Sequence, residues 1–278
     1  METSSNFCVS VIIPTKNEEH NITRCLQSIL AQAYSPIEIL VIDNNSRDKT
    51  VSLAKQYTRN VFLHGPERSA QRNYGTQKAK GTYFLFLDAD MELEQGVITE
   101  CVTLLQKNPR TKACVIPETL VGSTFLQRCR SLEKECYIGD DVMEGARFFE
   151  SKAFFDVGGY DATLIASEDW DLHQRVKQTG AHIARTKARI IHHEKEGTLI
   201  DIMRKKYYYG LHLPKYVKKH PVLARLQYRF FRPAFFKNWK KLVSHPTLLV
   251  GLIVIKCAEF SAGGMGYLIG VWQHHKDH

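Results

Sequence analysis

Signatures of several protein classes are missing from this chain. Its 278 residues include seven cysteines, but they contain no CxxC pair and are not evenly spaced along the chain. This scatter argues against a disulfide framework and against a zinc site, and it predicts reduced thiols in a cytosolic compartment. No basic segment precedes the short apolar run at residues 7–13, so we expect a first strand there and not a signal peptide.

Two common nucleotide-binding motifs are missing as well. The sequence contains neither GxGxxG, the dinucleotide fingerprint, nor GxxxxGK[ST], the phosphate-binding loop. It also has no internal repeat and no low-complexity segment. If the chain binds a nucleotide, it must therefore hold it in another way.

Charge is distributed unevenly along the chain. The net charge is +9, yet residues 1–200 carry 24 Lys and Arg against 26 Asp and Glu, whereas residues 201–278 carry 14 against 3. We therefore expect a near-neutral body, which ends near residue 200, and a strongly basic C-terminal segment.

Up to about residue 115, short apolar runs rich in β-branched and aromatic residues alternate with helical patterns. Strands that are apolar on both faces and alternate with helices predict a mostly parallel α/β sheet covered on both sides. We expect strands at 8–15, 37–43, 60–64, 82–90 and 113–117, helices at 18–34, 68–81 and 96–108, and a turn followed by a helix at 44–57.

Polar residues follow three of these strands, where the strands leave the core. They are Thr15–Glu18, Asp43–Ser46 and Asp88–Asp90. Because ligands of such sheets bind at the carboxyl ends of the strands, we expect these groups to line a binding crevice.

The pair Asp88 and Asp90 ends the apolar run "YFLFL". Alternation along a strand predicts that both carboxylates lie on one side, where a divalent cation would relieve their repulsion. Mg²⁺ or Mn²⁺ holding a diphosphate fits such oxygen ligands. The alternative is a turn with two solvated or capping acids.

A second acidic stretch reads "SEDWDLHQRV". We expect Ser167 to cap a helix whose first turn holds Glu168 and Asp169. These acids either complement the helix dipole or supply an ionised carboxylate that accepts a proton. Asp171 and Arg175 are four residues apart and are expected to pair on the helix surface.

Together these motifs, from about Val9 to His193, resemble the family 2 glycosyltransferases, which are inverting enzymes of the GT-A fold. The matching segments stand in the expected order: "VSVIIPTKNEEHNITRCLQSI", "IEILVIDNNSRDKT", "SAQRNYGTQKAKGTYFLFLDAD", "GARFFESKAFFDVGGYD", "SEDWDLHQRV" and "ARIIHHE". The resemblance implies a GT-A catalytic domain at 1–200, with a nucleotide-binding half at about 1–115 and an acceptor half at about 116–200.

The resemblance also implies roles for individual residues. Asp169 is the catalytic base, with Glu168 beside it in the acidic motif, and Asp88, Asp90 and His192 are the metal ligands, with His193 as the alternative to His192. The implied nucleotide-sugar contacts are Pro14, Thr15, Asn17, Glu18, Asp43, Arg72, Asn73 and Asp88. A plain surface arginine remains the alternative for Arg72. Asn44 stands where the family often has Asp, and we assign it no contact.

The expected activity is inverting, metal-dependent hexosyl transfer from a UDP- or GDP-sugar to a hydroxyl of a lipid-linked or glycan acceptor. The metal neutralises the departing diphosphate while the base takes the acceptor proton. One alternative is a polyprenyl-phosphate glycosyltransferase, whose acceptor needs no base. The other, from a different class, is a basic nucleic-acid-binding protein with a degenerate nucleotide fold, whereas the expected partners of the glycosyltransferase include no nucleic acid.

Residues 201–278 mix cations with aromatic residues and then become apolar. This composition predicts a membrane-associating helical segment on an anionic, cytoplasm-facing surface, attached peripherally or monotopically. Lys256 and Glu259 interrupt the apolar stretch at 247–272 and are spaced to pair with each other. A re-entrant hairpin bent at Gly263–Gly264, a single span and a packed core helix all stay open.

Overall fold

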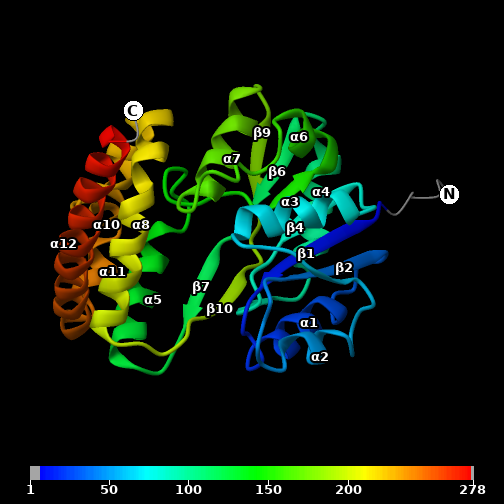
Figure 1. Ribbon diagram of the computed structural model, residues 1–278, viewed down its shortest axis with the longest axis horizontal. Helices are drawn as coiled ribbons and strands as arrows, with labels where there is room; N and C mark the ends of the chain where they lie inside the picture. The colour runs from blue at the N-terminus through cyan, green and yellow to red at the C-terminus, as the bar shows by residue number, and fades with distance from the viewer. Residues whose placement is uncertain (1–6, 277–278) are drawn as a thin grey trace. The chain divides into compact units, whose positions relative to one another are not determined.

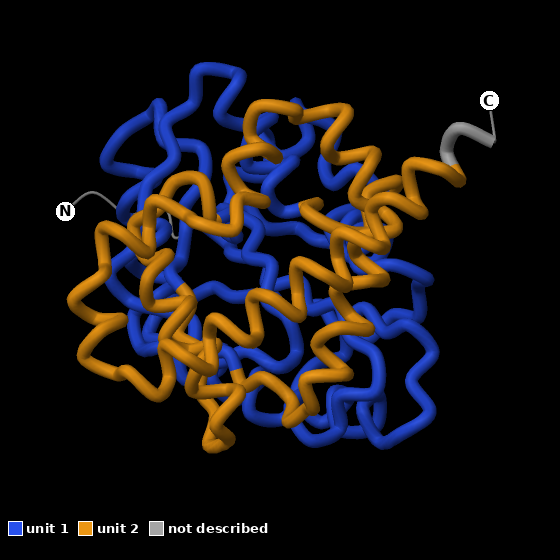
Figure 2. Tube along the Cα trace, turned by 90° about the vertical axis from the view of Figure 1, so that its left-hand side faces the viewer, with its two compact units in different colours: residues 1–117, 145–162, 169–192 blue, residues 118–144, 163–168, 193–278 orange. Residues whose placement is uncertain are grey.

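The computed structural model describes residues 7–276 and divides the chain into two compact units (Figure 2). Unit 1 comprises Met1–Pro117, Gly145–Ala162 and Asp169–His192, and unit 2 comprises Glu118–Glu144, Thr163–Glu168 and His193–His278. Each unit is thus assembled from three separate pieces of sequence. The functional division at residues 115 and 200 stays a prediction.

Unit 1 contains a seven-stranded sheet with the strand order β3-β2-β1-β4-β8-β6-β9 (Figure 1). The strands are β1 (Val9–Thr15), β2 (Ile37–Asp43), β3 (Val61–Leu63), β4 (Tyr83–Phe86), β6 (Thr111–Val115), β8 (Phe148–Glu150) and β9 (His182–Arg185). β1 pairs in parallel with β2 and β4, and β2 pairs in parallel with β3. The predicted mostly parallel α/β sheet is confirmed, except that β8 lies antiparallel between β4 and β6.

Helices cover both faces of this sheet because its strands bury side chains alternately on either side. Along β1, Ile13 packs with Leu26 and Val97 on one face, whereas Ile12 packs with Phe154 and Leu172 on the other. The helices are α1 (Ile22–Leu30), α2 (Thr50–Ala54), α3 (Arg68–Lys78), α4 (Val97–Lys107), α6 (Ser151–Asp156) and α7 (Glu168–Gln178). Continuous burial of β1 explains why its sequence shows no polar alternation.

The acidic pair lies in a turn after β4 and not within a strand. β4 ends at Phe86, and the backbone amide of Met91 closes a turn on the carbonyl of Asp88, 3.0 Å away. A short strand, β5 (Met91–Leu93), follows and pairs antiparallel with β10 (Ile190–His193). Strand alternation therefore does not set the directions of Asp88 and Asp90, and that part of the prediction is wrong.

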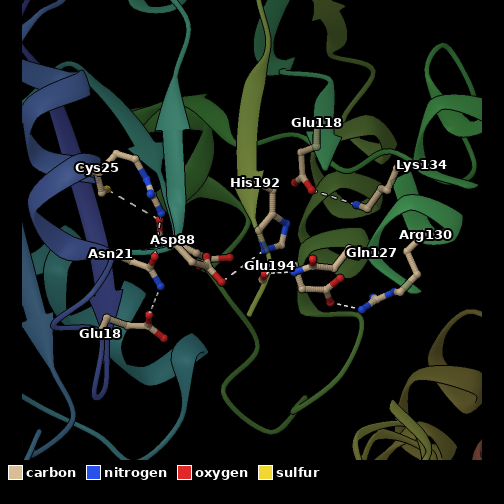
Figure 3. A network of polar contacts seen from close by, with 12 residues as sticks. Glu18, Asn21, Cys25, Asp88, Glu118, Gln127, Arg130, Lys134, His192 and Glu194 are labelled. Carbon is tan, nitrogen blue, oxygen red and sulfur yellow. Dashed lines mark hydrogen bonds and ion pairs between the residues drawn. The ribbon is translucent and has the colours of Figure 1, made fainter. Parts of the chain in front are cut away.

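Unit 2 is mainly helical (Figure 1). Its elements are β7 (Glu118–Val121), α5 (Phe125–Tyr137), α8 (Leu199–Lys219), α9 (Pro221–Gln227), α10 (Pro233–Lys237), α11 (Trp239–Val243) and α12 (Pro246–Lys276). Its apolar core joins Leu132 of α5, Leu242 of α11 and Leu252 of α12. Two ion pairs, Lys134 with Glu118 and Arg130 with Glu194, tie α5 to neighbouring segments (Figure 3).

α12 is one continuous helix, so the hairpin bent at Gly263–Gly264 is wrong. The glycines of this region instead let α8 and α12 approach closely. A Cβ atom on Gly210 of α8 would collide with the carbonyl of Gly263, and one on Gly266 would collide with the carbonyl of Tyr207. The glycines that suggested a bend in the sequence thus belong to a close contact between α8 and α12, which we call the glycine seam.

Lys256 and Glu259 are buried inside unit 2 and pair with each other as predicted. Lys256 Nζ also lies 2.6 Å from Glu133 Oε1 on α5, and Lys206 Nζ of α8 lies 3.4 Å from Glu259 Oε1. Arg232 contributes a further cation, 3.3 Å from Glu133. Buried charges need such partners, so these groups form one ionic cluster, with Glu133 and Glu259 opposing three cations.

Glu133→Gln is expected to destabilise unit 2 by about 3–5 kcal/mol at neutral pH, because it leaves Glu259 as the one carboxylate of the cluster opposite its three cations. Burial raises the pKa of Glu133, but Lys256 and Arg232 outweigh it and lower that pKa from 4.5 to about 2. The stabilisation is therefore present above the ordinary value of 4.5 and is lost as the pH falls toward 2.

Hydrogen exchange of the α12 amides, measured between neutral pH and pH 3, checks this expectation. Glu135→Gln is the matched control, since Glu135 lies on the same helix but is more exposed and sits 4.0 Å from Lys241. Equal protection of α12 in both variants at neutral pH would contradict the proposed contribution of the cluster.

Candidate active site

Residues after β1 and β2 form a cross-linked pair of loops. Asn17 has a left-handed backbone with φ of 54°. Its backbone amide donates to Ser46 Oγ at 2.8 Å, and its side-chain oxygen accepts from the backbone amide of Arg47 at 2.9 Å. Glu18 accepts a hydrogen bond from the side chain of Asn21 at 2.8 Å (Figure 3). The two hydrogen bonds of Asn17 therefore join the two loops, and its left-handed backbone, which asparagine adopts readily, directs both groups toward the second loop.

Asp43 lies fully buried at the end of β2, beside Thr15 in the sheet register. Its carboxylate accepts from the backbone amide of Ser46 at 2.8 Å and from the Ser46 hydroxyl at 2.5 Å. The Thr15 hydroxyl is also buried, and no hydrogen bond joins it to any of residues 7–276. Pro14 lies within buried β1. Nucleotide contacts by Pro14, Thr15, Asn17, Glu18 and Asp43 stay predictions.

Arg72 is the buried centre of the site. It projects from α3, has 0% of its surface exposed, and donates to Asp88 Oδ1 at 2.8 Å and to Asp169 Oδ1 at 2.9 Å. Arg147 Nη1 lies 3.6 Å from the other oxygen of Asp88. Burial raises the pKa of Asp88, but the charges of Arg72 and Arg147 outweigh it and hold that pKa well below its usual range. The surface-arginine alternative for Arg72 is therefore excluded.

The two oxygens of Asp169 have different surroundings. Oδ1 accepts from Arg72 and from the Tyr160 hydroxyl, which lies 3.1 Å away. None of the residues that the structure describes donates to Oδ2, and the side chain is 28% exposed. The Arg72 guanidinium also stacks over the Tyr160 ring at 5.1 Å. Asp169 is thus anchored through one oxygen, and the other is open to accept a proton.

The loop that carries Tyr160 is held by side chains from two helices. Asn73 donates to the Tyr160 carbonyl at 2.7 Å and accepts from its backbone amide at 2.9 Å. Arg175 donates to the carbonyls of Val157 and Gly159 at 2.5 and 2.6 Å. Asn73 therefore positions Tyr160 in this structure, and its predicted contact with a nucleotide stays a prediction.

Arg175 also pairs with Asp171 at 2.8 Å, as predicted. Asp171 is fully buried, however, so the predicted surface location of the pair is wrong. The pair is buried because Arg175 turns toward the Gly159 loop and not toward solvent.

Glu168 begins α7 and is buried, within unit 2. Ser167 has a left-handed backbone with φ of 66°, and its hydroxyl lies 2.7 Å from the Tyr228 hydroxyl. Helix α7 thus starts where the sequence predicted. The catalytic part assigned to Glu168 stays a prediction.

Asp90 and His192 come together from the turn after β4 and from β10. The antiparallel register sets His192 opposite Met91, and His192 Nε2 lies 3.3 Å from Asp90 Oδ2. Figure 3 shows His192 directed toward the acidic turn. Both side chains are partly exposed. A carboxylate and an imidazole at this separation fit a divalent cation that also takes oxygen ligands from a diphosphate. This geometry favours His192 over His193.

Asp88 differs from Asp90, because both of its oxygens face guanidinium groups. No group of three or more His, Cys, Asp or Glu side chains with metal-binding geometry occurs within residues 7–276. Asp90 and His192 are therefore the pair that fits a cation, and a metal contact by Asp88 stays a prediction.

The positioning roles of Arg147, Tyr160 and Arg175 were not predicted from the sequence, although the pair of Arg175 with Asp171 was. All three lie within the motifs quoted above, in "GARFFE", "VGGYD" and "SEDWDLHQRV". Two adjacent glycines before Tyr160, both with positive φ, were the available signal for a tight loop beside the site.

Comparison with known proteins extends these observations. The glycosyltransferase AglE of Haloferax volcanii is 37% identical over 111 residues, which cover 35% of this chain and 36% of that protein. A Campylobacter jejuni protein, GalNAc(5)-diNAcBac-PP-undecaprenol beta-1,3-glucosyltransferase, is 31% identical over 137 residues, or 46% of this chain and 41% of the relative. The chain spans between 14% and 41% of the length of the first five curated relatives that it matches.

A Mycobacterium tuberculosis protein, PGL/p-HBAD biosynthesis glycosyltransferase, is more distant but matches over most of both chains. It is 23% identical over 250 residues, which cover 86% of this chain and 94% of that protein.

Solved structures share the fold. The mannosyltransferase PcManGT from Pyrobaculum calidifontis, in complex with GDP-Man and Mn²⁺, has a TM-score of 0.65 at 17% identity and covers 94% of this chain and 86% of its own. Staphylococcus aureus TarS 1–349, in complex with UDP-GlcNAc, has a TM-score of 0.57 at 17% identity and covers 96% and 92%. The model of glycosyl transferase family 2 matches residues 10–154, more than half of the chain. The chain belongs to glycosyl transferase family 2 and has the GT-A fold.

Proposed function

We propose that this chain transfers a hexose, with inversion, from a UDP- or GDP-sugar to a hydroxyl of a lipid-linked or glycan acceptor. The observation that carries the proposal is the environment of Asp169, whose Oδ1 is anchored by Arg72 and Tyr160 while its Oδ2 stays open. A carboxylate held in this way can accept the proton of an attacking hydroxyl as the new bond forms. A single displacement with the base on the acceptor side inverts the anomeric centre.

The donor class is supported by the fold relatives. PcManGT was solved with GDP-Man and Mn²⁺, and TarS with UDP-GlcNAc, so both UDP- and GDP-sugars remain in the proposal. Thr15 supports the same assignment, because its buried hydroxyl at the carboxyl end of β1 bonds to none of residues 7–276.

Asp90 and His192 would hold the proposed Mg²⁺ or Mn²⁺. A divalent cation there neutralises charge on the departing diphosphate. Asp88 has a different part in this proposal, since it is paired with Arg72 and Arg147. It holds Arg72 in place, and Arg72 in turn holds Asp169.

The lipid-linked acceptor is supported by the Campylobacter jejuni relative, whose name contains an undecaprenyl diphosphate. It is also supported by α12, which contains the one helical stretch within residues 7–276 that is long and apolar enough to cross a membrane, Pro246–Gln273. We accordingly include attachment to the cytoplasmic face of a membrane, peripheral or monotopic, in the proposal.

A panel of UDP- and GDP-sugars, assayed with hydroxyl and polyprenyl-phosphate acceptors and with NMR of the product anomer, tests this function. We expect transfer to a hydroxyl with inverted configuration. Transfer to polyprenyl phosphate that survives Asp169→Asn would instead favour the phosphate acceptor, because that acceptor needs no base. Binding of RNA without turnover of any sugar nucleotide would overturn the enzymatic proposal.

Removal of the divalent cation is expected to abolish transfer. Asp90→Ala is expected to reduce the rate of transfer by at least about 100-fold at saturating donor, which is the typical effect of removing one group that stabilises developing charge. Donor turnover measured with EDTA and with restored Mn²⁺ checks the first part. Glu92→Ala, two residues along in β5, is the matched carboxylate control and should retain near wild-type turnover. Wild-type turnover in Asp90→Ala, or in EDTA, would show that the metal assignment is wrong.

A further inference from the structure

One face of α12 is apolar and exposed along most of the helix. Its exposed apolar side chains, which we call the α12 stripe, are Val250, Ile253, Val254, Met265, Leu268 and Trp272. Their spacings of three, four, seven and eleven residues, each close to a whole number of turns, set them on one side of the helix. At 1.5 Å per residue the stripe is about 33 Å long.

No charge interrupts the stripe. The only charged residues between 246 and 272 are Lys256 and Glu259, and both turn inward to the ionic cluster with Glu133 and Lys206. Because the cluster holds both charged side chains inside unit 2, the outward face of α12 carries no charge between residues 246 and 272.

A basic and aromatic patch adjoins the start of the stripe. α11 packs against α12, and Leu242 of α11 shares a core with Leu248 of α12. The exposed residues of this patch are Phe236, Trp239, Lys237, Lys240 and Lys241. Aromatic rings with lysines beside an apolar face are typical of segments that lie at the headgroup level of a bilayer.

The packing of α8 argues against a transmembrane orientation of α12. The glycine seam brings the α8 backbone against α12 at Tyr207 and Leu211, and Figure 1 shows the two helices running side by side. Arg204 and Lys205 of α8 are exposed, and they directly precede Lys206, which approaches Gly263 near the middle of α12. A span by α12 would carry these cations into hydrocarbon, which is strongly unfavourable.

We propose that unit 2 docks on an anionic phospholipid bilayer with α12 in the plane of the interface, its stripe at the boundary of headgroups and acyl chains. This inference rests on the membrane attachment included in the proposed function and names its partner and geometry. Anionic lipid is the occupant because residues 201–278 carry 14 Lys and Arg against 3 Asp and Glu. The lysines of α11 lie at the lipid phosphates, and salt weakens this attraction. The stripe adds hydrophobic binding free energy, which salt does not screen.

Cys257 supplies a probe for the test, since it is exposed on α12 near the middle of the helix. Among the described cysteines only Cys8 is also accessible in part, so full-length Cys8→Ser protein directs a thiol-reactive fluorophore to Cys257. The labelled protein is mixed with vesicles of phosphatidylglycerol and phosphatidylcholine, or of phosphatidylcholine alone. We expect a blue shift and flotation with the anionic vesicles, at least tenfold more protein bound than with the neutral ones, and incomplete release by high salt.

The depth of the Cys257 probe in the bilayer distinguishes an α12 that lies in the plane of the interface from an α12 that spans the membrane. Spin labels high on the acyl chain should quench the Cys257 probe at least twofold more than spin labels near the chain end. The reverse order would overturn the inference, because a spanning α12 sets Cys257 near the bilayer centre. Absence of binding to anionic vesicles would overturn it as well. So would a concentration-dependent dimer that protects Cys257 without lipid, since a second copy would then cover the stripe.

Matched leucine variants separate the stripe from general surface effects. Leu268→Glu should reduce binding to anionic vesicles at least tenfold, whereas Leu63→Glu, on β3 of unit 1, should bind like wild type; the two leucines are 70% and 64% exposed. Both variants should keep wild-type donor turnover in solution. If wild type docks but turns over no sugar nucleotide, the proposed function fails and the docking stands; if Leu268→Glu binds vesicles like wild type, the docking fails alone.

Discussion

Asp169→Asn is expected to lower the rate of sugar transfer by about two to four orders of magnitude while donor affinity changes little. Asparagine keeps the shape of the side chain and can still accept from Arg72 and Tyr160 through one oxygen. It replaces the open Oδ2 by an amide nitrogen, which cannot take a proton. Single-turnover rates at saturating donor, with donor affinity measured separately, check the expectation.

Tyr160→Phe is the graded comparison, because it removes one anchor of Asp169 Oδ1 and leaves the base itself. We expect a loss of about 10- to 100-fold, in the range of one hydrogen bond to a charged group. If Asp169→Asn loses donor affinity together with transfer, Asp169 belongs to the donor site. If it retains wild-type transfer, the assignment of the base is wrong.

Arg72→Met is expected to reduce the stability of unit 1 by about 3–5 kcal/mol and to remove measurable transfer. The substitution keeps an unbranched side chain in the buried space but leaves Asp88 paired with Arg147, which is 3.6 Å away. Arg72→Lys should recover only part of the loss, because a single ammonium cannot reproduce the fork that reaches Asp88 and Asp169 together. Denaturant unfolding and hydrogen exchange within unit 1 provide the measurement.

The pH dependence follows from Asp88. Its folded-state pKa lies below the ordinary value of 3.8, so the pair with Arg72 contributes stability above that value and loses it as the pH falls further. The stability difference between wild type and Arg72→Met should therefore be largest above pH 3.8 and should shrink as the pH falls below that value. The double variant Arg72→Met/Asp88→Asn should be more stable than the two single losses predict by addition, because the carboxylate of Asp88 is no longer left without Arg72. Strict additivity would contradict the coupling.

Local patterns were sufficient for the framework of residues 9–115. β1, β2 and α4 match their predicted ranges closely. A strand that is buried on both faces needs a continuous apolar run, and a helix that is buried on one side needs apolar residues at helical spacing, so both patterns can be recognised in the sequence. β8 was not predicted, since its three residues carry too little periodicity to be distinguished from a loop.

The errors at the site concern contacts between residues far apart in sequence. An arginine in a polar helix is ordinarily exposed, and Arg72 is buried only because Asp88 and Asp169, 16 and 97 residues away, converge on it. Lys256 looked like an interruption of a membrane stretch because Glu133 lies on another helix. Asp90 and His192 could be predicted as metal ligands because both stand in family motifs. The resemblance did not decide between His192 and His193.

The interleaving of the two units determines where the chain can be cut. Removing everything after residue 200 looks from the sequence like a clean separation of a catalytic body from its tail. It would in fact strip α12 from α5 and leave Leu132 and Cys136 without the α11 and α12 side chains that cover them. Glu133 would lose Lys256 and Arg232 in the same step. A shortened enzyme therefore needs repair of α5, with polar residues at its newly bared positions, before it can be expected to remain in solution.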